Sequence, residues 1–162
     1  MASVEERLAE MGITVPEATA PAAAYVLTVR TGNHLYVSGQ LPLGLDPLPV
    51  ATLSAADHIE QGAEPGPGLA AAQAAARQCG INLIAQIKAA TGDLESVVRV
   101  VKLVGFVNSA PDYRQQHLVM NGASQLIQTA FGDKGLHARS AVGVAALPFG
   151  VVVEVEAIVE LA

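Results

Sequence analysis

Residues 137–161 read HARSAVGVAALPFGVVVEVEAIVEL, and this stretch decides the fold. Arg139 opens a run of small and apolar residues, residues 147–150 are typical of a turn, and a second run follows with glutamates at alternate positions. Alternation with a period of two indicates β-strands. The pattern predicts a β-hairpin whose returning strand buries one face and carries Glu154 and Glu156 on the other.

Arg139 and Glu154 are the two groups in this hairpin that can carry chemistry. A guanidinium is planar, stays ionised and binds a carboxylate through two parallel hydrogen bonds, which suits recognition of a small organic acid. A partly buried glutamate on the adjoining strand could hold or activate water beside that ligand. The alternative, which spacing alone supports equally, is an ion pair between the two that only staples the hairpin. Glu156 is expected to be structural or interfacial.

The composition predicts one folded domain over residues 1–162. The chain is 51% hydrophobic and 15% charged, which argues against disorder and suggests that another subunit covers part of the surface. A net charge of −6, without a cluster of basic residues, disfavours nucleic acid as a partner. We therefore expect a homo-oligomer without a nucleic-acid partner.

Several other classes of site lack a sequence signal. The single cysteine, Cys79, is consistent with the cytoplasm and is interpreted as a buried apolar side chain rather than a reactive thiol. No signal peptide or membrane-spanning run is evident. The four histidines lack metal-ligand spacing, and no nucleotide-binding loop or nucleophile elbow occurs. The sequence predicts no metal, no cofactor and no membrane partner.

The remaining elements follow from periodicity and from helix-capping and turn residues. A capping box at Ser3 predicts an N-terminal helix ending near Gly12, and residues 1–20 form a helix-and-loop extension. Gly39 within a strand indicates a bulge or a close approach to the backbone. The predicted order is a helix, strands over residues 25–30 and 35–41, a long loop over 44–68 with a weak strand near 49–53, a helix over 69–90, a strand over 97–107, a helix over 109–131, and the C-terminal hairpin.

This order predicts an α+β fold, a two-layer sandwich in which two long helices cover one face of a mixed sheet. Self-association is the simplest cover for the other face. The second helix carries a polar stripe opposite its apolar stripe, made of His117, Asn121, Ser124 and Gln128. That stripe is interpreted first as a solvated face; the alternative is a subunit boundary where Asn121 reaches a pocket.

Four segments resemble the Rid (YjgF) family, the reactive intermediate deaminases. They are residues 21–26, Ser38-Gly39-Gln40-Leu41-Pro42, residues 138–148 (ARSAVGVAALP) and residues 153–157 (VEVEA). The resemblance spans about residues 20–160. It implies a chorismate mutase-like fold and a homotrimer with ligand pockets between subunits.

The resemblance also implies roles for individual residues. Arg139 would bind a substrate carboxylate, Glu154 would position the attacking water, and Tyr25 would line the pocket. Gly39, next to Ser38, would offer its backbone to the ligand, and Asn121 loosely matches an asparagine at the pocket. The implied reaction is hydrolysis of 2-imino or enamino acids, released by pyridoxal-phosphate enzymes, to 2-oxo acids and ammonia, with no cofactor.

The chain departs from compact deaminases in its N-terminal helix, its extended loop before the long helix, and its longer segment between residues 107 and 139. It resembles a divergent branch of the family. Three functions are therefore weighed: an imine deaminase, a non-catalytic regulatory module that binds small carboxylates, and the ribonuclease activity attributed to some relatives. The acidic balance ranks the ribonuclease lowest.

Overall fold

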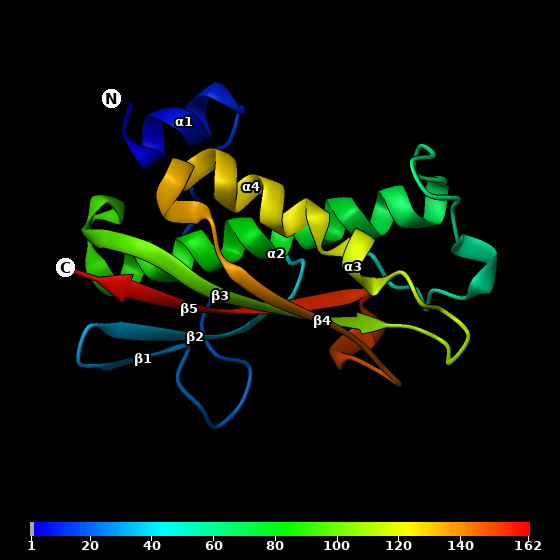
Figure 1. Cartoon of the computed structure of the whole chain (residues 1–162). Coiled ribbons are helices and arrows are strands. Elements are labelled where there is room, and N and C mark those ends of the chain that lie inside the picture. The colour runs from blue at the N-terminus through cyan, green and yellow to red at the C-terminus, as the bar shows by residue number, and fades with distance from the viewer. Residues whose placement is uncertain (1) are drawn as a thin grey trace.

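The computed structural model describes residues 2–162 as a five-stranded sheet with helices packed along one face (Figure 1). The helices are α1 Val4–Glu10, α2 Pro67–Thr91, α3 Gln116–Val119 and α4 Asn121–Phe131, and the strands are β1 Thr28–Thr31, β2 His34–Gln40, β3 Val97–Asn108, β4 Ala138–Val144 and β5 Val153–Leu161. Short 3-10 turns lie at Ala55–Asp57, Leu94–Ser96, Gly132–Gly135 and Pro148–Gly150. The mixed α+β sandwich is confirmed.

The predicted C-terminal hairpin is wrong. The strand order is β1-β2-β5-β3-β4, so β3 lies between β4 and β5 and hydrogen-bonds to both. β3 pairs with β4 in parallel and with β5 in antiparallel orientation. The two strands and the turn at residues 148–150 were recognised correctly, but their local pattern carries no information about a third strand inserted between them.

The long helix α2 is the centre of the helical layer. Pro67 at its first turn and Gly92 in left-handed conformation at its C-cap define its ends. Cys79 on its inner side is fully buried, and its Sγ lies 3.7 Å from the carbonyl oxygen of Val153. Burial raises the pKa of this thiol well above its ordinary value, so Cys79 is an inert core residue as predicted. No helix within residues 2–162 combines the length and apolarity needed to cross a bilayer.

The second predicted helix begins later than its sequence indicates. Ser109, followed by Pro111, resembles a helix start, but the Ser109 hydroxyl donates to the carbonyl of Val107 and Ser109 forms a β-bridge with Leu53. The helix begins at Gln116 and bends at Met120, where α3 gives way to α4. Residues 109–115 instead form a loop at the end of β3.

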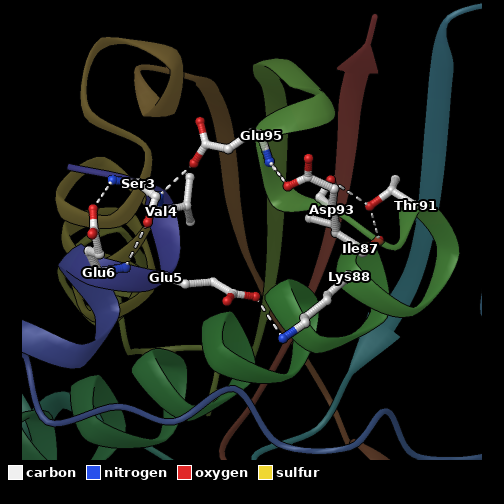
Figure 2. A network of polar contacts seen from close by, with 9 residues as sticks. All are labelled: Ser3, Val4, Glu5, Glu6, Ile87, Lys88, Thr91, Asp93 and Glu95. Carbon is white, nitrogen blue, oxygen red and sulfur yellow. Dashed lines mark hydrogen bonds and ion pairs between the residues drawn. The ribbon is translucent and has the colours of Figure 1, made fainter. Parts of the chain in front are cut away.

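The N-terminal helix α1 is confirmed and is fixed to the helical layer by several polar contacts (Figure 2). Ser3 and Glu6 form the capping box, and the Val4 amide donates to Glu95 Oε1 at 2.7 Å. Lys88 on α2 forms an ion pair with Glu5 at 2.6 Å. Because Val4 is also buried in the core, α1 is an integral part of the fold.

The face of the sheet opposite α2 and α4 carries no α-helix within residues 2–162 (Figure 1). Val29, Tyr36 and Val142 are exposed on it. Isolated exposed apolar residues are common, but Val29 and Tyr36 are directly paired on β1 and β2, and such a contiguous apolar patch is typical of a surface that associates.

We predict that Gly122→Ala destabilises the protein, because an added Cβ would collide with the backbone carbonyl of Gln73 where α4 crosses α2. Backbone cannot move aside as a side chain can, so we expect a loss of about 1–3 kcal/mol in free energy of unfolding. Gly80→Ala is the matched control, because its Cβ would come too close only to the flexible end of Leu126 and would reach the Ala123 backbone at ordinary contact distance. Urea unfolding of both variants measures the difference, and equal stabilities would contradict the prediction.

Candidate functional site

Arg139 lies at the start of β4, with its side chain under the bend between α3 and α4. Its Nη1 donates to Asn121 Oδ1 and to Ser124 Oγ, both at 3.1 Å, and its Nη2 donates to the carbonyl of His117 at 3.0 Å. The polar stripe of the second helix is therefore not a solvated face at these positions: Ser124 is buried, and Asn121 is half-buried and holds the guanidinium. We call Arg139 and its three acceptors the Arg139 cluster.

The acceptors of the Arg139 cluster are all uncharged. Within residues 2–162, neither ion pair of the structure involves Arg139, and the expected alternative of an Arg139–Glu154 staple does not form. Partial burial lowers the pKa of Arg139, but an arginine stays ionised at physiological pH. Three of its five N–H donors are engaged, which leaves two for an external acceptor.

Sequence reasoning missed one member of this region, His137. Its Nε2 lies 3.0 Å from Ser124 Oγ and its Nδ1 lies 2.6 Å from the carbonyl oxygen of Gly135. Burial is the largest cause that lowers the pKa of His137, and the charge of Arg139 lowers it further. Ser124 stood in the predicted polar stripe, but no sequence signal linked it to His137.

Glu154 lies on β5, against the backbone of Gly39 on β2. The bulge predicted at Gly39 is confirmed: the register between β2 and β5 shifts between Val37 and Gln40. A Cβ at Gly39 would collide with Glu154 Oε1, so the close approach that the glycine indicated is made by this carboxyl group. Burial raises the pKa of Glu154, and the charge of Glu156 adds to the effect.

Ser38 precedes Gly39 on β2 and is hydrogen-bonded to the segment that follows Tyr25. The Ser38 hydroxyl donates to the carbonyl of Val26 at 2.9 Å, and its amide donates to the carbonyl of Leu27. Ser38 therefore fixes the segment that precedes β1 and carries Tyr25, whose side chain is 46% exposed. β1 begins at Thr28, so Tyr25 lies before the strand rather than in it.

Within one chain, the predicted site residues fall into two groups on opposite faces of the sheet. Arg139 is paired with Leu103 and shares the buried, helix-covered face with it, as does Ala157. Glu154 is paired with Phe106 and lies on the opposite face. Directly paired residues share a face and neighbours along a strand alternate, so the side chains of Arg139 and Glu154 lie on opposite faces, and β3 lies between their strands. Glu154 does not lie on the strand adjoining Arg139.

A cavity of about 490 Å³ lies next to the Arg139 cluster, between residues 59–65 and helices α2 and α3. Asn121 and His117 line the cavity and also contact Arg139, so they form a shared wall. The other wall is largely apolar and includes Ile59, Leu69 and Leu118. Residues 2–162 contain no group of three or more His, Cys, Asp or Glu side chains arranged to hold a metal ion.

The sheet order and helical layer define a two-layer α+β protein with the chorismate mutase-like fold, shared with the YjgF gene product of Escherichia coli (24% identity; 99% of this chain and 98% of that chain; TM-score 0.58). Residues 15–161 match the family described as Endoribonuclease L-PSP. The chain therefore belongs to this family, which is the Rid (YjgF) family of the resemblance.

Two relatives are considerably more similar to this chain. Protein TCP17 from Trypanosoma cruzi is 48% identical over 160 residues, covering 98% of this chain and 94% of that protein. The structure of protein Atu1372 from Agrobacterium tumefaciens is also 48% identical, covers 98% of this chain and 92% of that chain, and has a TM-score of 0.82. RidA from an Antarctic Psychrobacter reaches 28% identity and a TM-score of 0.57, with coverage of 90% and 94%. The lower TM-score is consistent with a divergent branch.

We predict that Glu154→Gln changes the pH dependence of stability. Because the pKa of Glu154 is raised in the folded protein, its contribution to stability is present below the unfolded pKa and is lost as pH rises through the folded pKa. The variant should therefore gain stability relative to wild type as pH rises above about 4.3, the ordinary value for glutamate. Urea unfolding across pH measures this gain, with Glu160→Gln on the same strand face as control. A constant difference across pH would contradict the prediction.

Proposed function

We propose that this protein hydrolyses reactive 2-imino and enamino acids to 2-oxo acids and ammonia. The observation that carries the proposal is the state of Arg139: a half-buried cation, held in place by three uncharged acceptors, with two donors left over. Its position is fixed while its charge stays uncompensated within the described chain. Such a group favours a small anionic ligand, and a planar carboxylate matches the guanidinium geometry.

Glu154 supplies the second requirement, a base for water. Its raised pKa makes the carboxylate a better proton acceptor than an exposed glutamate, and its position against Gly39 restricts its orientation. Water adds to the imine carbon as Glu154 takes one of its protons. That proton passes to the imine nitrogen, which gives a tetrahedral carbinolamine. The proton of the new hydroxyl group then also reaches the nitrogen, the C–N bond breaks, and ammonia leaves as the C=O bond forms. The balance is imino acid plus water to 2-oxo acid plus ammonia.

A single ligand can contact both groups only if they come from two copies of the chain, because the Arg139 cluster and Glu154 lie on opposite faces of the sheet. We propose a homotrimer with one site at each of the three boundaries. Exposed apolar residues on the open face, including Tyr36 and Val142, support association there. The site would combine Arg139 and Asn121 of one subunit with Glu154, Gly39, Ser38 and Tyr25 of the next.

The alternative is a non-catalytic module that binds 2-oxo or related acids in the same cleft. This module would use the same Arg139 cluster to bind the acid, but Glu154 would not activate water and no hydrolysis would follow. Ribonuclease activity has less support, because the chain has 15 acidic against 9 basic lysine and arginine residues. Ammonia release decides between the first two functions.

We predict that the protein accelerates ammonia release from 2-aminoacrylate generated in situ. Arg139→Met should lower kcat/KM about 100-fold through lost carboxylate binding, and Glu154→Gln should lower kcat about 100-fold or more through lost proton transfer. Ammonia and pyruvate are measured against the spontaneous rate, with Arg77→Met as control. Pyruvate binding without any acceleration by wild type would identify the non-catalytic module instead.

We further predict that the two inactive variants restore each other when mixed. In mixed oligomers, some boundaries pair the intact Arg139 of one variant with the intact Glu154 of the other, so activity should return after co-expression or subunit exchange. Activity of the mixture and the oligomer mass by light scattering are measured together. If mixed oligomers form but stay inactive, the two residues do not share a site across a boundary.

A further inference from the structure

The Arg139 cluster continues through a second line of contacts into the protein. Arg139 Nη1 donates to Ser124 Oγ, which is within hydrogen-bond distance of His137 Nε2. His137 Nδ1 is in turn within hydrogen-bond distance of the carbonyl oxygen of Gly135. The three distances are 3.1, 3.0 and 2.6 Å. This line joins β4, α4 and the 3-10 turn at Gly132–Gly135, three elements that come together only in the folded chain.

Hydrogen-bond valence fixes the protons along this line. The carbonyl of Gly135 can only accept, so His137 Nδ1 carries a proton. In the neutral imidazole the lone pair is then on Nε2, and the Ser124 hydroxyl donates to it. The oxygen of Ser124 then accepts a hydrogen bond from Arg139 with a lone pair. No other arrangement is possible, because a guanidinium only donates hydrogen bonds.

We propose that Ser124 and His137 are positioning residues that hold Arg139 in place for an anionic ligand. His137 orients the Ser124 hydroxyl, and this hydroxyl, instead of a carboxylate, binds the guanidinium. The inference rests on the proposed function for the identity of the ligand. An aspartate in place of Ser124, the side chain that contacts the guanidinium, would also accept its hydrogen bond but would neutralise the charge that the ligand needs. We call the uncharged pair Ser124 and His137 the neutral relay. It fixes the direction of the guanidinium and leaves the positive charge of Arg139 available to the ligand.

The charges around His137 make the relay coupled to ligand binding. His137 contacts the uncharged Ser124 on α4 and the carbonyl of Gly135 in the preceding turn. Arg139 on β4 is the charged group that acts on His137, and Asp133 and Lys134 precede it in the turn. Protonation would turn Nε2 into a donor and set two cations on one hydroxyl oxygen. A bound anion would relieve this repulsion, so ligand binding and protonation of His137 favour each other.

The first test follows the His137 ring by NMR in full-length protein. The ¹⁵N shifts should show the Nδ1–H tautomer at neutral pH, and saturating pyruvate should raise the pKa of His137. Arg139→Met should raise that pKa without ligand and abolish the effect of pyruvate. An Nε2–H tautomer, or a pKa that does not respond to Arg139→Met, overturns the relay. If pyruvate does not change the pKa of His137 in the wild type but Arg139→Met does, the proposed ligand class is wrong and the relay is supported.

The second test separates positioning from folding. Ser124→Ala and His137→Ala should each raise the pyruvate dissociation constant and the KM roughly tenfold, the loss expected for a hydrogen bond to a charged group, with much smaller changes in kcat. His137→Gln keeps an acceptor for the Ser124 hydroxyl but cannot titrate, so it should recover most of the affinity and lose the pH dependence of binding. His34→Gln, in the β1–β2 hairpin, is the control. Equal losses in His137→Gln and His137→Ala, or a pH dependence retained in His137→Gln, would overturn the proposal.

Discussion

The parallel pairing of β3 with β4 is the constraint on which the rest of the structure depends. Parallel neighbours cannot be joined by a tight turn, so the chain between Asn108 and Ala138 must cross over the sheet. That crossover contains α3 and α4, and it brings Asn121, Ser124 and the carbonyl of His117 over the start of β4. The acceptors that hold Arg139 are thus supplied by the connection that the sheet topology requires. The register of β3 with β5 places Glu154 on the opposite face of the sheet.

The elements of the fold were largely predictable from sequence because they have local causes. The capping box at Ser3, the apolar stripe ending at Gly92 and the largely apolar strand over residues 97–107 each depend on residues within a few positions of one another. The strand order was not predictable in the same way. An apolar strand indicates a central position but not which strands flank it, and the turn at residues 148–150 favoured direct pairing of the strands on either side.

The candidate site shows the same division between local and long-range information. The glycine in the Ser38-Gly39-Gln40 strand predicted a close approach, and the structure supplies the Glu154 carboxyl group that makes it. The sequence motif marked Arg139, but its acceptors come from 15 to 22 residues earlier, and its hydrogen-bonded link to His137 runs through Ser124. Contacts of this kind join elements that are far apart in the sequence. They depend on how α4 packs against β4, which the hydrophobic periodicity of the sequence does not encode.

The burial of Cys79 has a practical consequence. The chain's single thiol is enclosed beneath β5 and stays protonated, so maleimides and other alkylating reagents will find no reactive sulfur on the native surface. A cysteine introduced at an exposed position away from the open face, such as Gln125 on α4, would then be the sole labelling point without prior removal of a native thiol. A fluorophore or spin label placed there would test the proposed trimer by measuring distances between labels on different copies of the chain.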